Sequence, residues 1–324
     1  MSTSQVTAAL DLLADATVGP GYTRLGYLLR QAQWPAHDPR PQSLAGKTAL
    51  VTGANSGLGY ITSVELARLG ARVILACRDC DRGTSALRQA RRAAPTATFE
   101  LRICDIANLA SLRQTGHELA HTTPVLDLLI HCAGVLPAQR GETPEGHEIT
   151  LATHVLGPLL LTELLRGNLT AAHDSRVIFV SSGGMYTQRL HAEDPEYRHG
   201  IYRGATAYAR TKRMQVELTP LLAQRYKPNH ITVAAMHPGW VDTPGIATSL
   251  PTFYRLTRPL LRTPLQGADT ITWLAATQPT PPTGLFWHDR RARPTHYLPH
   301  TRSTPKQITK LWNYCVDAIN LTNP

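Results

Sequence analysis

The length, composition and charge of this chain exclude several classes of protein. Its 324 residues are 42% hydrophobic and 17% charged, which is enough for a sizeable core and ordinary for one α/β domain. The net charge is +10, but the basic residues are dispersed and accompany no nucleic-acid motif, so we expect no nucleic-acid partner. The N-terminus lacks a signal-peptide pattern and no apolar run of about 18 residues exists, so we expect a cytoplasmic protein with reduced cysteines.

Residues 1–45 are predicted to form an N-terminal extension. Short amphipathic stretches lie around Val6–Leu13 and Tyr22–Trp34, and a proline-rich linker covers residues 35–41. A helix of this kind buries one face. We therefore expect the extension to pack on the main domain, or to contact a membrane surface weakly or a partner.

A regular alternation of strands and helices occupies residues 46–300. Short apolar runs predict strands at Thr48–Thr52, Arg72–Cys77, Thr98–Cys104, Val125–His131, Arg176–Ser181, Ile231–Met236 and Gly284–His288. Helical periodicity lies between them at Leu58–Leu69, Arg82–Arg92, Leu109–Leu119, Glu145–Leu169 and Ala205–Tyr226. This pattern predicts an α/β fold, a Rossmann-like doubly wound parallel sheet of about seven strands with helices on both faces. In residues 301–324, Thr304-Pro305 predicts the start of a C-terminal helix.

A glycine-rich loop follows the first predicted strand and opens the first helix. Glycines let the backbone approach a pyrophosphate, and the N–H groups at a helix N-terminus favour its negative charge. The loop therefore predicts dinucleotide binding through Gly53, Asn55, Ser56, Gly57, Leu58 and Gly59.

The ends of the next three strands extend this prediction. After the second strand the chain has Arg78 where a carboxylate would meet a free ribose hydroxyl, which favours NADP(H) over NAD. The alternative is a surface arginine, with Asp79 supplying the acid. Asp105, followed by Ile106, is placed to accept a hydrogen bond from adenine, and small residues near the ribose are expected at Cys132, Ala133 and Gly134.

Tyr208 and Lys212 are spaced to share one face of a helix. A phenol has a pKa of about 10, and a nearby positive charge favours its ionised form. The pair therefore predicts a group that moves a proton to or from a carbonyl oxygen.

The order and spacing of these motifs resemble the short-chain dehydrogenase/reductase family over about residues 46–300. The resemblance implies that Ser182, or less well Ser181, hydrogen-bonds the substrate oxygen. It implies that Tyr208 is the general acid-base and that Lys212 binds the nicotinamide ribose and lowers the tyrosine pKa. The segment expected to touch the nicotinamide carboxamide contains Pro238, Gly239 and Val241, with Thr243 nearby.

His154 departs from the family pattern. It stands where the family has an asparagine that helps to hold a water relaying protons to the lysine. A histidine can also hold a water, so we predict that His154 takes part in catalysis. The alternative is a histidine that packs in a helix without a relay role.

The function predicted from these residues is NADP(H)-dependent interconversion of a carbonyl and an alcohol. Met185, Tyr186, Leu190 and Trp240 predict a pocket for a lipophilic substrate, although surface packing of this segment is an equal alternative. The other function considered is a nucleotide-binding regulatory or scaffold protein that has lost turnover. The family resemblance further implies a homodimer or homotetramer formed through the Glu145–Leu169 and Ala205–Tyr226 helices.

Two patterns that resemble metal sites are interpreted differently. His117, Glu118 and His121 match H-E-x-x-H, but they fall on a helix predicted to lie outside the sheet. Cys77 and Cys80 have the spacing of a zinc or redox pair without a second pair at a suitable distance. We therefore predict no metal site.

Overall fold

The fold is known from a computed structural model that describes residues 11, 15, 17, 19–249 and 251–321. The amphipathic stretch predicted around Val6–Leu13 therefore lies, apart from Asp11, outside the described residues. Among the helices of the described ranges, none is long and apolar enough to cross a membrane.

The predicted doubly wound sheet is confirmed, with one strand more than expected. The described strands are β1 Thr48–Thr52, β2 Arg72–Cys77, β3 Phe99–Ile103, β4 Leu128–His131, β5 Ser175–Val180, β6 Ile231–Met236, β7 Leu285–His288 and β8 Arg291–Ala292. They form one eight-stranded sheet in the order β3-β2-β1-β4-β5-β6-β7-β8, parallel up to β7. β8 is antiparallel and is joined to β7 by Asp289 and Arg290, both at positive φ as a tight hairpin turn requires. The sequence lacks the usual Asn-Gly signal for such a turn, so β8 was not predicted.

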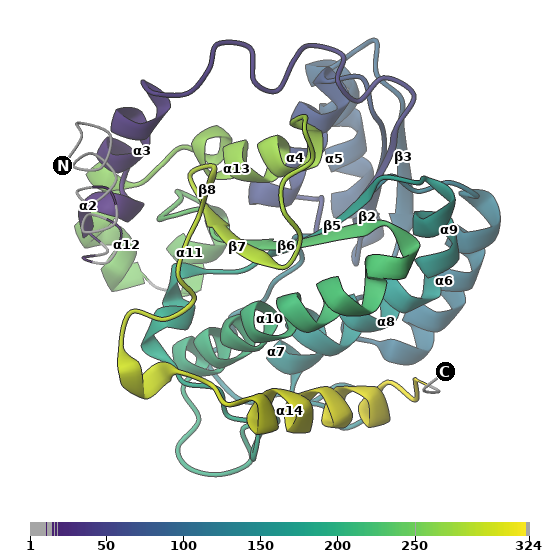
Figure 1. The fold of residues 1–324 in the computed structure, drawn as a ribbon. Helices are drawn as coiled ribbons and strands as arrows, with labels where there is room; N and C mark the ends of the chain where they lie inside the picture. Colours follow the sequence, from purple (N-terminus) through teal and green to yellow (C-terminus); the bar gives the residue numbers. More distant parts are fainter. Residues whose placement is uncertain (1–10, 12–14, 16, 18, 250, 322–324) are drawn as a thin grey trace.

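Helices cover both faces of the sheet (Figure 1). One face carries α4 Gly57–Arg68, α5 Cys80–Ala93 and α13 Pro264–Ala276; the other carries α6 Leu109–Thr122, α8 Gly157–Leu164, α10 Gly204–Tyr226 and α14 Pro305–Ala318. Side chains alternate between these two layers along each strand. In β1, for example, Leu50 packs on the side of the sheet covered by α6, α8, α10 and α14. Ala49 and Val51 pack on the side covered by α4, α5 and α13.

The long helix predicted over Glu145–Leu169 is wrong in its start and in its continuity. The segment consists of α7 Ile149–Leu151, a π-helical turn at Ala152–Leu156, α8, and α9 Arg166–Ala171. Glu148 caps the start by accepting from the N–H groups of the next turn, so the helix cannot begin earlier. Gly157 follows the π turn because a Cβ there would lie 2.0 Å from the carbonyl oxygen of Ile106.

The remaining described helices are short connections around the strand ends. They are α2 Gly19–Tyr22, α3 Arg24–Gln31, α11 Pro244–Ser249, α12 Pro251–Thr257 and the single turns Gly183–Thr187, Lys227–Asn229, Arg258–Leu260 and Pro299–Thr301. In Figure 1, α2 and α3 lie on the same side of the molecule as α11 and α12. Tyr22 of α2 is fully buried within the core, so the described part of the extension packs on the main domain.

Candidate active site

The candidate site lies at the carboxyl edge of the sheet, beside β1. The chain leaves β1 toward β2 on one side, whereas β4 pairs with β1 on the other, so the strand order reverses here. In open parallel sheets the crevice at such a reversal is the usual ligand site.

The backbone of the glycine-rich loop fits a pyrophosphate. Gly53 has a φ of 67°, and a Cβ there would lie 2.7 Å from the Cα of Ala133. A Cβ on Gly59 would lie 2.4 Å from the carbonyl oxygen of Gly53, so a larger residue would displace the start of α4. Ser56 precedes α4 without a capping hydrogen bond from its side chain, so that side chain leaves the first N–H groups available for an anion.

Hydrogen bonds join the loop to the end of β4. The hydroxyl of Thr52 accepts from the backbone N–H groups of Cys132 and Ala133 at 3.0 and 3.1 Å. Asp105 lies after β3, where its carboxylate accepts from the N–H of Ala107 at 3.0 Å. Gly134 lies beside His154, since a Cβ on it would be 3.3 Å from the Nε2 atom of that histidine.

The side chains that follow β2 include two arginines and an aspartate. Arg78 is exposed, and no hydrogen bond or ion pair engages its guanidinium within the part of the chain that the structure describes. Asp79 caps α5 by accepting from the N–H of Arg82 at 2.8 Å, so its carboxylate has a structural role. With its amide oxygen turned toward Arg82, Asn55 accepts from that guanidinium at 3.2 and 3.3 Å. The sequence did not indicate that Arg82 lies beside Asn55 of the glycine-rich loop, because this contact depends on the turn at Asp79 that begins α5.

Ser182, Tyr208 and Lys212 come together after β5. The side chain of Ser182 lies close enough to the phenol of Tyr208 to lower its pKa, and its hydroxyl accepts from the N–H of Gly184 at 3.2 Å. Lys212 lies one turn further along α10, with its Nζ 5.5 Å from the centre of the Tyr208 ring and donating to the carbonyl oxygen of Val180 at 2.7 Å. The hydroxyl of Ser181 is engaged by the backbone, since it donates to the carbonyl oxygen of Lys212 at 2.9 Å. The geometry therefore favours Ser182 over its neighbour.

The pKa values of this group differ from the expectation that Lys212 ionises Tyr208. Burial raises the pKa of Tyr208 to about 12, although the hydrogen bond from Ser182 opposes the shift. Burial also lowers the pKa of Lys212 to about 7, against a smaller effect of Cys132. Desolvation disfavours the charged form of both groups, so the protein side chains alone do not provide the predicted lowering of the tyrosine pKa.

His154 is fixed by its neighbours in a way that conflicts with a water-holding role of its ring. Its Nδ1 is 2.8 Å from the hydroxyl of Thr211, and its Nε2 accepts from the N–H of Val135 at 3.1 Å. Burial, with the nearby Lys212, lowers the pKa of His154 well below its usual value, so the ring is neutral. Each ring nitrogen of a neutral imidazole makes one such bond. While both bonds persist, the ring has no nitrogen left for a relay water.

The pocket predicted from the segment after Ser182 is not formed by its apolar side chains. Met185, Tyr186 and Leu190 are buried in the core between the sheet and α10. Tyr186 donates its hydroxyl to the carbonyl oxygen of Pro294 at 2.6 Å, which fixes it away from a substrate. Trp240 is partly exposed and packs edge-on against Phe253 with ring centres 5.1 Å apart, so it remains a candidate for the pocket wall.

The segment after β6, which is predicted to contact the nicotinamide, lies against the glycine-rich loop. A Cβ on Gly267 of α13 would meet both Val241, at 2.5 Å, and Leu58, at 2.8 Å. A Cβ on Gly57 would likewise lie 3.7 Å from the Cγ2 atom of Thr243. The two predicted halves of the cofactor site are therefore adjacent.

The metal-like patterns have structural explanations. His117, Glu118 and His121 are exposed on α6, outside the sheet. A further group of possible ligands within the described residues consists of Asp15, His237 and His288. The two imidazole rings are stacked with centres 3.8 Å apart, and Asp15 accepts from the Nδ1 of His288 at 2.6 Å. Asp15 therefore anchors His288 by a hydrogen bond, whereas the Nε2 atoms of His237 and His288 are buried without a hydrogen-bond partner among the described residues.

A dinucleotide cradle joined to a Ser–Tyr–Lys group at the edge of a doubly wound sheet defines the class of nucleotide-binding oxidoreductases. A family model described as short chain dehydrogenase matches residues 47–252. The protein belongs to this family, as its motifs predicted, and is an oxidoreductase of carbonyl and alcohol groups.

Curated relatives share most of the chain. It is 38% identical to dehydrogenase/reductase SDR family member 12 of Bos taurus, covering 90% of this chain and 91% of that protein. It is 35% identical to retinol dehydrogenase 14 of Mus musculus, covering 85% and 86%. Among solved structures, an uncharacterised protein of Mycobacterium Paratuberculosis has a TM-score of 0.69 and 27% identity, covering 89% of this chain and 98% of that one.

Proposed function

We propose that the protein is an NADP(H)-dependent oxidoreductase that interconverts a carbonyl and an alcohol, with Tyr208 as the acid-base. The observation that carries the proposal is the grouping of Ser182, Tyr208 and Lys212 at the edge of the sheet that holds the glycine-rich loop. When bound, the reduced cofactor supplies the hydride. Ser182 would hold the substrate oxygen by a hydrogen bond, and Tyr208 would give its proton to that oxygen as negative charge develops.

Lys212 would serve this step in two ways. Its ammonium, when protonated, is a donor for a ribose hydroxyl and a positive charge one turn from the phenol. Its pKa of about 7 means that protonation is balanced near neutral pH, so a polar ligand that favours the charged amine would shift the balance. The lowering of the tyrosine pKa would then depend on ligand binding.

The choice of NADP(H) rests on Arg78, and substituting it by aspartate tests the choice. The variant Arg78→Asp is expected to weaken NADPH binding about tenfold to a hundredfold, because a carboxylate repels a 2′-phosphate. NADH binding should change little or improve. Fluorescence titration of both cofactors measures the change, with Arg92→Asp on the exposed last turn of α5 as a control. Tighter binding of NADH than NADPH by the unchanged protein would reject the NADP assignment.

The substrate class is proposed to be lipophilic, of the aldehyde, ketone or primary alcohol type. This proposal is supported by the relatives named retinol dehydrogenase and by the partly exposed Trp240 beside the segment after β6. The test is to assay a panel of aldehydes, ketones and quinones that includes retinal and to measure turnover as the oxidation of NADPH. Cofactor binding without turnover on the panel, unchanged by Tyr208→Phe, would favour the regulatory alternative.

We also propose that the extension contacts a membrane surface from a cytoplasmic location. Leu25, Leu28 and Leu29 of α3 are 61%, 43% and 62% exposed, and Arg24 precedes them on the same helix. The double substitution of Leu25 and Leu29 by serine is expected to weaken binding to anionic vesicles about tenfold, through loss of buried apolar area. Cosedimentation measures it, with Ile201→Ser as the control because Ile201 is exposed but lies on another segment. Equal sedimentation of all three proteins would contradict the proposal.

The surface proposed for a homodimer or homotetramer needs revision. The C-terminal helix α14 packs along α10, and Arg225 of α10 lies over the ring of Trp312 of α14 at 5.5 Å. Figure 1 shows α14 beneath α10 and α8. Because α14 covers part of this surface, a proposed oligomer would have to form elsewhere or include α14.

A further inference from the structure

Arg262 joins the N-terminal extension to the segment after β6. This arginine is 1% exposed and is situated just before α13. Its guanidinium donates to the backbone carbonyls of residues 21–23 at 2.9 to 3.2 Å and to the carbonyl of Pro238 at 3.2 Å. The carboxylate of Asp289 accepts from both Nη atoms, at 2.6 and 2.8 Å. A fork of donors in fixed geometry therefore holds three separate segments together.

The segment Pro238–Val241 is enclosed by these contacts. The N–H of Trp240 donates to the carbonyl of Tyr22 at 2.9 Å, and the carbonyl of Trp240 accepts from the N–H of Arg262 at 2.7 Å. Gly239 has a φ of 77°, and a Cβ there would lie 2.6 Å from the guanidinium carbon and 2.8 Å from the carbonyl oxygen of Tyr22. The extension thus sets the position of the backbone that we expect to contact the nicotinamide.

Tyr22 of the extension also packs against the segment that follows β5. A Cβ on Gly183, the residue after Ser182, would lie 2.3 Å from the Tyr22 ring. On its other side this ring packs against His237, with centres 4.5 Å apart. One residue of the extension therefore touches both segments that carry predicted site residues.

Buried charges hold the extension in place. Arg30 of α3 pairs with Asp289 at 2.6 Å and with Asp15 at 3.2 Å, and Asp15 in turn bonds His288. Although burial opposes it, the nearby His288 and Arg262 keep the pKa of Asp289 below its usual value, so the pair is ionised. Undocking the extension would separate Arg30 from Asp289 and Asp15 from His288, whereas Asp289 would keep Arg262 as its partner.

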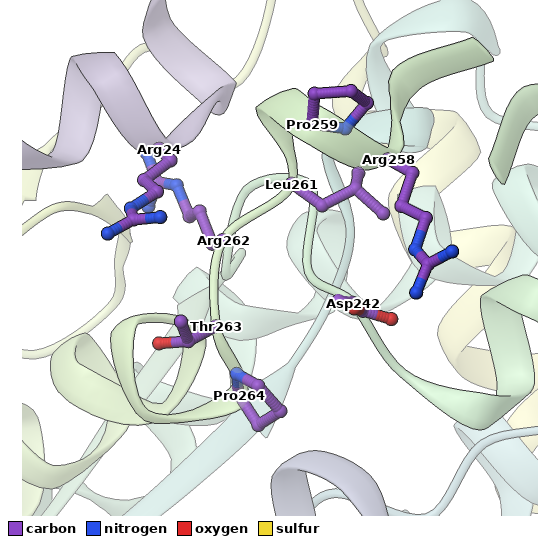
Figure 2. A pocket seen from close by; sticks show the side chains of 8 residues that line it. All are labelled: Arg24, Asp242, Arg258, Pro259, Leu261, Arg262, Thr263 and Pro264. Atoms are coloured by element: carbon purple, nitrogen blue, oxygen red, sulfur yellow. The ribbon is translucent and has the colours of Figure 1, made fainter. Parts of the chain in front are cut away.

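The outer edge of this contact is hollow. A cavity of about 430 Å³ opens between Arg24 of α3 and the Arg258–Pro264 segment, beside Asp242 (Figure 2). The extension is therefore held away from this edge, by the buried rings of Tyr22 and Tyr27 and by the hydrogen bonds of Arg262 and Arg30.

We infer that residues 19–31 act as a clamp for the nicotinamide half of the cofactor site, with Arg262 as its positioning residue. The inference rests on the proposed NADP(H) function. By linkage, binding of the nicotinamide half and docking of the clamp favour each other. We expect ligands that occupy the adenine half alone to be independent of the clamp. Among the described residues, the side chains of Arg262 and Arg30 bond only the extension, Pro238 and Asp289, and neither bonds Arg78 or the glycine-rich loop.

Binding of NADPH and of 2′,5′-ADP, which lacks the nicotinamide, tests the inference. Arg262→Lys and Arg30→Gln are both expected to raise the Kd for NADPH about tenfold while the Kd for 2′,5′-ADP changes by less than about twofold. Arg176→Lys is the matched control: Arg176 is also buried and donates to the carbonyls of Leu274 and Thr277, near the opposite end of β5. It should destabilise the protein without changing the ratio of the two Kd values.

Hydrogen exchange of the full chain gives a second readout that does not depend on variants. NADPH should slow the exchange of amides in residues 19–31, and 2′,5′-ADP should not. An unchanged ratio of Kd values in both arginine variants, or equal protection by the two ligands, would overturn the clamp alone. Failure of the unchanged protein to bind either ligand would instead reject the proposed cofactor.

Discussion

Replacing Tyr208 by phenylalanine is expected to lower kcat/KM for carbonyl reduction by about 10²- to 10⁴-fold, the usual contribution of a general acid. The substitution removes one hydroxyl from a side chain on the otherwise well-packed helix α10. NADPH affinity and the free energy of unfolding should therefore change little. Steady-state kinetics with the best substrate of the panel, together with cofactor titration, measure both quantities.

The control for this variant is Tyr202→Phe. Tyr202 is also a partly buried tyrosine, but its hydroxyl donates to Glu148 at 3.0 Å, away from Ser182. Its loss should leave the rate within about threefold of the unchanged protein. A Tyr208→Phe variant as active as this control would show that another group delivers the proton.

Replacing Lys212 by methionine is expected to abolish most turnover and to change how stability depends on pH. The pKa of Lys212 is about 7 in the folded protein against 10.5 for an ordinary lysine, because burial disfavours the ammonium. Between these values the unfolded chain binds more protons than the folded one, so the free energy of unfolding rises with pH. The buried lysine destabilises the fold fully below about pH 7. This destabilisation decreases by up to about 1.4 kcal/mol per pH unit as the pH rises toward the lysine pKa of the unfolded chain.

Urea unfolding of both proteins at about pH 7.5, 8.5 and 9.5 isolates this effect. The unchanged protein should gain stability with pH relative to Lys212→Met, because other titrating groups contribute equally to both. Turnover of the variant should fall at least about a hundredfold. Parallel pH dependences would show that Lys212 keeps its proton in the folded protein, and the account of its burial would then be wrong.

Local sequence signals predicted the backbone geometry of the glycine-rich loop and the placement of Tyr208 and Lys212 on one helix. The glycine-rich loop could be recognised because Gly53 and Gly59 are required by close backbone approach, a constraint that acts over a few residues. The spacing of Tyr208 and Lys212 likewise predicted their common face, because α10 is a regular helix. These predictions concern placement, and the roles of the residues remain proposals.

The features that were missed depend on contacts far apart in the sequence. Arg262 meets the carbonyls of residues 21–23 across some 240 positions, and periodicity carries no information about such a pair. Met185 and Leu190 are consistent in the sequence with either a pocket wall or surface packing, whereas the structure buries both in the core. The neutral, doubly bonded state of His154 depends on Val135 and Thr211, which lie on two other segments.

The state of His154 also changes where a proton relay would run. Its ring nitrogens are both engaged, and its backbone carbonyl accepts from the side chain of Gln215 at 2.7 Å. A carbonyl oxygen has two lone pairs, so this atom can still accept a second bond. A proton relay to Lys212 would therefore need the carbonyl oxygen of His154 in place of its imidazole.

Transfer of deuterium from NADPH labelled at the nicotinamide C4 position tests the central claim most directly. The account predicts that the purified protein gives an alcohol with deuterium on the former carbonyl carbon, and that Tyr208→Phe gives almost none under the same conditions. Tight binding of NADPH without deuterium transfer to any carbonyl of the panel would contradict it.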